Sequence, residues 1–135
     1  LITHDKKEFN CTNELQLTKL DDLIINEYYP YYTNSDVIII DEIQFFKDAY
    51  KFILNAVNID NKHIICAGLS GDFNKKSFDV INSLIPESDE VYFLKAKCSC
   101  GNLAQFSKRL IKDDSQVLIG SSDLYKPVCR KCYKL

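Results

Sequence analysis

The segment Val37–Ile40 constrains the fold of this chain more than any other segment. Its four consecutive β-branched residues are typical of a buried strand in a parallel sheet, because such a strand is covered on both faces. Two acids, Asp41 and Glu42, follow directly, where the strand must leave the sheet. Ligands of open α/β sheets bind outside the carboxyl ends of the strands, so this acidic pair indicates a site for Mg²⁺ and a nucleotide.

The composition narrows the class of protein. A chain of 135 residues is long enough for one domain, or for one domain with a small appendage. The net charge of −2 provides no broad basic field, so we expect no nucleic-acid partner. No apolar run approaches the roughly 20 residues of a membrane span, and the first ten residues are too polar for a signal peptide. We therefore expect a cytoplasmic protein without a membrane partner, in which the six cysteines are metal ligands or core residues rather than disulfides.

Hydrophobic residues after the first strand follow a helical spacing, at i, i+3, i+4, i+7 and i+8. They are Ala49, Phe52, Ile53, Ala56 and Val57. His63–Ala67 has the composition of a second buried strand, so this order of strand, helix and strand predicts a βαβ unit with parallel strands. A further short helix is expected at Phe78–Ile85, before Pro86, and a third strand at Val91–Ala96.

Two closely spaced cysteine pairs form the second informative pattern. Cys98 and Cys100 precede Gly101, and Cys129 and Cys132 follow after an interval of 28 residues. Four thiolates hold Zn²⁺ tetrahedrally, and such a site can contribute about 10–16 kcal/mol of folding free energy in small zinc peptides. A segment of about 40 residues can hardly bury enough core by itself, so the spacing predicts a structural zinc site.

Other interpretations of the cysteines stay open from the residues alone. The spacing Cys98-x-Cys100 is one residue shorter than the usual pair, although Gly101 stands where a knuckle glycine belongs. The four residues could instead be ordinary buried cysteines, or Cys98 and Cys100 could form a strained contact. Cys66 lies within the second predicted strand and is expected to be a core residue.

With the acidic strand end and the cysteine pattern in view, the chain resembles the type II, zinc-containing thymidine kinases, a P-loop family. The resemblance runs from about Thr3 to Tyr133, and five segments in the family's order carry it. These segments are 41–46 (DEIQFF), 68–73 (GLSGDF), 107–110 (SKRL), 119–125 (IGSSDLY) and 128–133 (VCRKCY). The short segment Thr3–Asp5 resembles a further family motif. The sequence departs from the family pattern at Ser70, where Asp is usual, and in the short spacing of its first cysteine pair.

The resemblance implies an α/β fold of the P-loop, RecA-like type with a small zinc-binding lasso domain. Residues 1–94 would be part of the nucleotide-binding domain, and residues 95–135 would form the zinc-binding domain with its substrate lasso. The sequence contains no G-x-x-x-x-G-K-[ST] phosphate loop. We therefore expect a longer parent protein that supplies this loop, and we expect the present chain alone to be inactive. The family also implies a homotetramer.

The implied reaction transfers the γ-phosphate of ATP to the 5′-hydroxyl of thymidine. The resemblance makes Asp41 the residue that orients Mg²⁺ on ATP and Glu42 the general base on the hydroxyl. Such a base typically contributes about 10²–10⁴-fold in rate. Arg109 would be a cation near the substrate. From the residues alone, the acids could instead be a pair of strand-end charges, and Arg109 could be a solvated surface residue.

The resemblance also implies a pocket for the thymine ring. Aromatic walls bind such a ring by stacking, Leu69 would lie near its methyl group, and backbone groups of the lasso would meet its polar edge. The expected substrate-binding residues are Gln44, Phe45, Leu69, Phe73, Arg109, Val117, Ile119, Gly120 and Tyr125. The zinc ligands would be Cys98, Cys100, Cys129 and Cys132, and the metal would be structural because thiolates alone leave no open position for water.

Two other functions remain as alternatives. The run from Asp41 to Gln44 could belong to the D-E-x-Q box of a helicase or another P-loop ATPase, but this interpretation leaves the cysteine pattern unexplained. Salt-dependent binding to DNA without thymidine affinity would support it. The second alternative is a zinc-stabilised binding module without enzymatic activity, which predicts that replacing Glu42 changes nothing.

Overall fold

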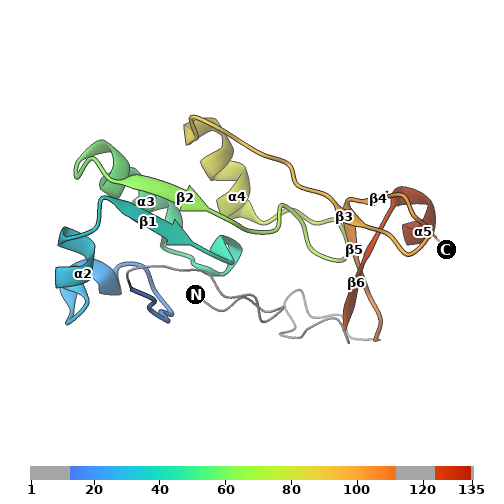
Figure 1. The fold of residues 1–135 in the computed structure, drawn as a ribbon, viewed down its shortest axis with the longest axis horizontal. Coiled ribbons are helices and arrows are strands. Elements are labelled where there is room, and N and C mark those ends of the chain that lie inside the picture. The colour runs from blue at the N-terminus through green and yellow to red at the C-terminus, as the bar shows by residue number, and fades with distance from the viewer. Residues whose placement is uncertain (1–12, 112–123, 135) are drawn as a thin grey trace.

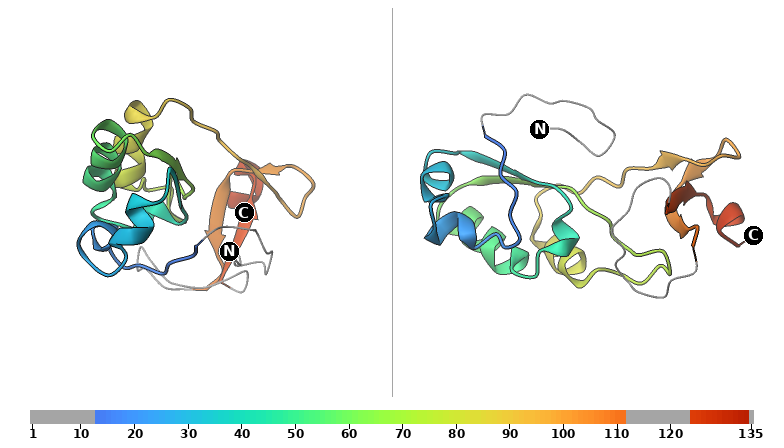
Figure 2. Two further views of the ribbon diagram at one scale, coloured as in Figure 1. Left: turned by 60° about the vertical axis from the view of Figure 1, so that its left-hand side comes forward. Right: turned by 90° about the horizontal axis from the view of Figure 1, so that it is seen from below.

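The computed structural model describes residues 13–111 and 124–134, which are arranged in two parts. The first part holds α1 to α4 with β1 and β2, and the second holds β3 to β6 with α5 (Figure 1). Two further views show the second part to one side of the first (Figure 2). None of the helices within the described ranges is long and apolar enough to cross a membrane.

Strands β1 (Val37–Ile40) and β2 (His63–Cys66) form a parallel pair in which residue 37 lies opposite residue 63 and residue 40 opposite residue 66. Helix α3 (Ala49–Asn58) connects them, so the predicted βαβ unit is confirmed. The apolar face of α3 is buried because its spacing of three and four residues returns the same face to the sheet. The buried residues of this helix are Ala49, Phe52, Ile53 and Ala56.

Short helices complete the first part. They are α1 (Asp22–Ile25), α2 (Tyr29–Thr33), α4 (Asp79–Leu84) and the 3₁₀ turns η1 (Ile43–Phe45) and η2 (Ile85–Glu87). Helix α4 confirms the helix expected before Pro86. One hydrophobic cluster joins these elements to the strands. Its buried residues are Leu20, Leu23, Tyr32, Ile40, Ile43, Ala49, Phe52, Ile53, Ala56 and Leu84.

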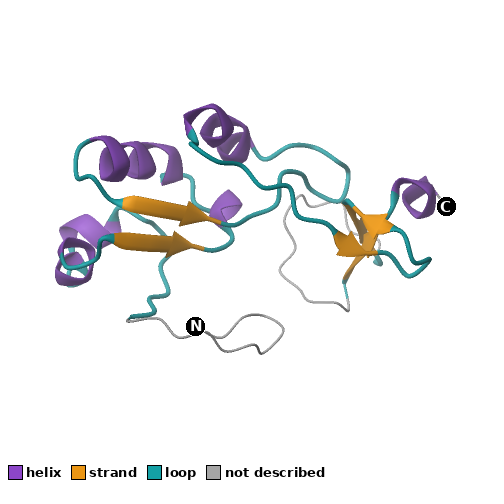
Figure 3. Cartoon of the chain, turned by 45° about the horizontal axis from the view of Figure 1, so that its top comes forward, coloured by secondary structure: helices purple, strands orange, loops and turns teal. Residues whose placement is uncertain are grey.

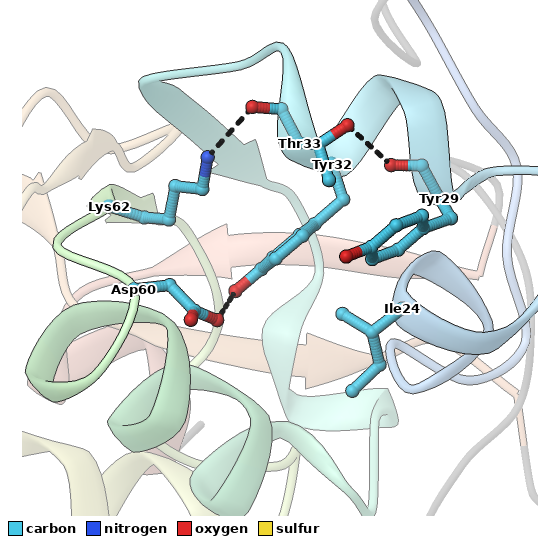
Figure 4. Close-up of a pocket in the computed structure, with 6 residues that line it drawn as sticks. All are labelled: Ile24, Tyr29, Tyr32, Thr33, Asp60 and Lys62. Atoms are coloured by element: carbon cyan, nitrogen blue, oxygen red, sulfur yellow. Dashed lines mark hydrogen bonds between the residues drawn. The ribbon is translucent and has the colours of Figure 1, made fainter.

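Side-chain contacts near the start of β1 and β2 connect the segments that lead into the two strands (Figure 4). The Tyr32 hydroxyl donates a hydrogen bond of 2.5 Å to Asp60, and its ring packs edge-on against Phe52 at 5.9 Å. The Lys62 ammonium donates to the carbonyl oxygens of Thr33 and Ser35, at 3.3 and 2.8 Å. Burial, together with the Asp60 carboxylate, raises the pKa of Tyr32. Because these contacts join the segments that lead into β1 and β2, they fix the strands at the end opposite the acids.

The expectation that the first strand is buried on both faces is wrong. Ile39 is 62% exposed, and Val37 and Ile65 also face outward. Cys66, expected in the core, is exposed as well. Figure 3 shows the reason, since α3 and α4 lie on one side of the two strands. The side chains on the other side of the two strands stay partly exposed in the described part of the chain, so the β-branched run is only half buried.

The third strand expected at Val91–Ala96 is also wrong. Only Ala96–Lys97 is a strand, β3, and it pairs antiparallel with β4 (Leu103–Ala104) rather than with the parallel sheet. Leu94, within the preceding apolar run, is 91% exposed. A strand needs a partner for its backbone hydrogen bonds, and no strand in the described ranges pairs with residues 91–95.

The second part is built from two antiparallel pairs and a terminal helix. Strand β5 (Phe106–Arg109) pairs with β6 (Tyr125–Val128), and α5 (Arg130–Lys134) follows. A second hydrophobic cluster lies here, and two of its four buried residues are cysteines. The cluster consists of Cys98, Ala104, Val128 and Cys129, with Phe106, Cys132 and Tyr133 packed against it. The domain boundary near residue 95 stays a prediction.

Candidate functional site

Asp41 and Glu42 form a sharp turn at the carboxyl end of β1, where both side chains are exposed. Glu42 has a φ of 51°, in the left-handed region that non-glycine residues adopt at a cost of roughly 1–2 kcal/mol. Its backbone N–H donates to the Asp41 carboxylate at 2.9 Å. The chain then pairs again with the segment after β2, through a hydrogen bond of 3.0 Å from Ile43 N–H to Ala67 O. The backbone pairing between the segment of β1 and the segment of β2 is therefore interrupted at Asp41 and Glu42, whose carboxylates are exposed.

The side chain of Gln44 holds Glu42 and the loop after β2 together. Its amide nitrogen donates to the Glu42 carboxylate at 2.5 Å, and its amide oxygen accepts from the Leu69 N–H at 3.1 Å. Gly68 permits this arrangement, because a Cβ at residue 68 would lie 2.5 Å from the Gln44 amide oxygen. The sequence shows Gly68 only as part of a motif and gives no sign of this close approach.

Arg109 lies between two aromatic rings. Its guanidinium carbon is 3.7 Å from the ring centre of Phe73 and 5.2 Å from that of Tyr125. It also donates to the Tyr125 hydroxyl at 2.5 Å, from the directly opposite position in the β5–β6 pair. Arg109 is buried, so its interpretation as a solvated surface residue is wrong. A guanidinium stacked on an aromatic face gains cation–π attraction, about 2 kcal/mol or more where the cation is desolvated.

Tyr133 is a residue of this site that the sequence analysis did not single out. Its hydroxyl donates to the carbonyl oxygen of Phe73 at 2.8 Å, across 60 positions of sequence. The Lys75 ammonium lies 4.3 Å from the Tyr133 ring centre, and the Phe106 ring packs against the same tyrosine at 5.6 Å. The loop after β2 is therefore fastened to the second part of the molecule. The signal in the sequence is its place as the last residue of the segment 128–133, directly after Cys132.

The predicted substrate residues fall into two groups. Phe45 and Leu69 lie near the acids, are about half exposed, and Phe45 meets Phe78 edge-on at 6.4 Å. Phe73, Arg109 and Tyr125 form the second group. The loop from residue 68 to residue 78 carries Leu69 and Phe73 and so joins the two groups. The remaining predicted contacts, as well as the family motif near the start of the chain, lie outside the described residues. These are Val117, Ile119, Gly120 and Thr3–Asp5.

The four predicted metal ligands come together. The sulfur atoms of Cys98, Cys100, Cys129 and Cys132 all lie within 4.8 Å of one another, and Cys100 and Cys129 are 3.6 Å apart. Tetrahedral Zn–S bonds of about 2.3 Å require sulfur separations of roughly 3.8 Å, so the cluster fits Zn²⁺. Cys100 is exposed, which argues against an ordinary buried core.

A tight turn explains how the short first spacing still meets the cluster. The Gly101 N–H donates to Cys98 O at 2.9 Å, and the Cys98 N–H donates to Asn102 O at 2.8 Å. Gly101 has a φ of +87°, which favours glycine, as expected for a knuckle. The turn therefore directs Cys98 and Cys100 toward the second pair with one residue fewer between them.

The charges of the thiols also favour a bound cation. Backbone N–H groups of Cys100 and Cys129 lower the pKa of Cys98 to about 6, because they stabilise its thiolate. The neighbouring thiols, led by that of Cys100, raise the pKa of Cys132 to about 12. Four thiolates this close repel one another, so full ionisation at neutral pH requires a metal ion.

Comparison with known proteins gives a consistent result. The family model described as Thymidine kinase matches residues 1–133. The chain is 37% identical to a thymidine kinase of Oryza sativa subsp. japonica and 40% identical to thymidine kinase a of Arabidopsis thaliana, each over 98% of its length. It is 42% identical to the thymidine kinase of Vaccinia virus (strain Western Reserve), also over 98% of its length.

These relatives are longer than the chain. It spans 48% and 55% of the two plant proteins, about half of their length, and 71% of the viral protein. The family match nevertheless extends over almost every residue of the sequence, including the acidic strand end and the four cysteines. The chain therefore belongs to the thymidine kinase family.

Proposed function

We propose that the full-length protein transfers the γ-phosphate of ATP to the 5′-hydroxyl of thymidine. The observation that carries the proposal is the pair Asp41 and Glu42, presented at the carboxyl end of β1 in a chain of this family. Phosphoryl transfer depends on positioning and on neutralising charge, and it needs a group that accepts the proton of the attacking hydroxyl. The turn and the bond from Gln44 hold one carboxylate in a defined place for that purpose.

Each acid has a separate role in this proposal. Glu42 accepts the proton of the 5′-hydroxyl, and its exposure leaves it accessible to a substrate. Asp41 would hold Mg²⁺ on ATP, since magnesium is bound by one or two carboxylates together with the substrate phosphates. Bound magnesium would neutralise the charge that develops on the phosphate oxygens. The sequence contains no G-x-x-x-x-G-K-[ST] motif, so the proposal assigns no residue of this chain to the phosphate loop.

The aromatic residues form the nucleoside pocket in the proposal. Phe45, Phe73 and Tyr125 are the walls for the thymine ring, and Leu69 lies near its methyl group. Arg109 stacks on Phe73 and bonds Tyr125, so it sets the positions of two walls besides adding positive charge. The backbone groups of Val117, Ile119 and Gly120 remain proposed contacts to the polar edge of thymine.

The metal site is structural in the proposal. Cys98, Cys100, Cys129 and Cys132 would hold Zn²⁺, and a complete set of thiolates leaves no position for a reactive water. The cysteines fasten both ends of the segment that carries the lasso. The homotetramer and the cytoplasmic location stay predictions.

Thymidine binding tests the pocket without requiring turnover. We expect the full-length protein to bind thymidine in isothermal titration calorimetry. Tyr133→Phe should weaken binding by about two- to tenfold, because a net hydrogen bond contributes about 0.5–1.5 kcal/mol and this one holds the Phe73 carbonyl.

Tyr92→Phe is the matched control, because it removes a tyrosine hydroxyl from an exposed side chain whose hydrogen bond within the described ranges goes to the nearby Glu90. Its thymidine affinity should equal that of the wild type. Binding of DNA with no thymidine affinity would instead support a helicase-like ATPase and refute the proposed pocket.

A further inference from the structure

The amide of Gln44 can be oriented in only one way. A backbone N–H can only donate, so the atom that meets the Leu69 N–H at 3.1 Å must be the amide oxygen. The NH₂ group must then point toward the Glu42 carboxylate, 2.5 Å away. One amide therefore connects the carboxylate at the end of β1 with the loop after β2.

The surroundings of this amide keep it in place. Gln44 is only 8% exposed, which is low for a polar side chain next to two exposed acids. A Cβ at residue 68 would lie 2.5 Å from the Gln44 amide oxygen and 2.8 Å from the Ile43 side chain. The absence of a Cβ therefore allows the turn after β1 and the loop after β2 to approach each other. Both hydrogen-bonding ends of Gln44 thus already have partners within the protein.

We propose that Gln44 is a positioning residue that aims the Glu42 carboxylate and ties it to Leu69, rather than a ligand of the nucleoside. This inference rests on the proposed function, in which Glu42 is the base and Leu69 lies beside the thymine methyl group. Selection of the base and orientation of the catalytic carboxylate share one hydrogen-bonded connection.

Gln44→Glu in the full-length protein distinguishes a residue that positions Glu42 from a residue that binds the nucleoside. The substitution keeps the length of the side chain and the acceptor for the Leu69 N–H, but replaces the NH₂ donor by an oxygen that repels Glu42. We expect kcat for thymidine phosphorylation to fall at least tenfold, while the dissociation constant of thymidine changes less than about twofold. Gln105→Glu is the matched control at an exposed position and should leave both values unchanged.

A double-mutant cycle identifies the route through Glu42. In a Glu42→Gln background, Gln44→Glu should lower the remaining kcat less than twofold, because the group that it positions is already absent. A purely structural role would give the same loss in both backgrounds and would overturn the proposal. Gly68→Ala, which pushes against the amide oxygen, should lower kcat in the same way as Gln44→Glu.

The remaining outcomes are also decisive. Weakened thymidine binding with unchanged kcat in Gln44→Glu would make Gln44 a substrate ligand. This result would overturn the inference and leave the proposed function intact. If that variant does not fold, Gln44→Met keeps the shape of the side chain, and an unchanged kcat in it would overturn the inference. A wild-type protein that does not phosphorylate thymidine would overturn the proposed function itself, and the inference with it.

Discussion

Glu42→Gln in the full-length protein is expected to lower kcat for thymidine phosphorylation by about 10²–10⁴-fold. The substituted amide keeps the size of the side chain but cannot accept the proton of the 5′-hydroxyl. The loss corresponds to about 3–5 kcal/mol of transition-state stabilisation. Steady-state kinetics with saturating ATP would measure it, and the dissociation constant of thymidine should stay within a few-fold of the wild-type value.

The control for this substitution is Glu87→Gln, because Glu87 is exposed and, among the residues that the structure describes, bonds only the Tyr50 hydroxyl. Its turnover should equal that of the wild type. The zinc content and the thermal unfolding of both variants should also match the wild type. Wild-type turnover in Glu42→Gln would remove Glu42 as the base, whereas a wild-type protein without turnover would favour a module without enzymatic activity.

Loss of the metal site should have the second large effect. Cys129→Ser removes one of the two buried cysteines of the second hydrophobic cluster, and with it one of the four predicted zinc ligands. Because structural zinc can supply about 10–16 kcal/mol of folding free energy in small domains, we expect residues from β3 to α5 to unfold. Elemental analysis should find about one zinc per wild-type chain and almost none in the variant, and thymidine binding should be lost.

Cys66→Ser is the matched control, since Cys66 lies in β2 and outside the metal cluster. It should keep the zinc and the thymidine affinity of the wild type. A wild-type protein that binds no metal, or a Cys129→Ser variant that folds and binds thymidine normally, would contradict the structural role of the cysteines.

Local patterns were sufficient to predict β1, α3, β2 and α4. The spacing of apolar residues in Ala49–Asn58 shows one helical face, and the run Val37–Ile40 shows a strand, because both signals depend on neighbours in sequence. The metal cluster could be predicted for a related reason, since the two cysteines of each pair are separated by only one or two residues in the sequence. Gly101 with its positive φ lies in the tight turn at the first pair.

Features that depend on distant contacts could not be predicted. The apolar run 91–94 has the composition of a strand, but pairing decides whether a strand forms, and no described strand pairs with it. The bond from Tyr133 to Phe73 spans 60 positions, and no local pattern signals it. Gln44 belonged to a recognised motif, yet only the structure shows that Glu42 and Leu69 occupy both ends of its amide.

The most direct test of the central claim is transfer of labelled phosphate from [γ-³²P]ATP to thymidine by the full-length protein with Mg²⁺. We expect labelled thymidine 5′-monophosphate to form, and we expect Glu42→Gln to form it at least 100-fold more slowly. Hydrolysis of ATP that is stimulated by nucleic acid, with no label on thymidine, would contradict the assignment of a thymidine kinase.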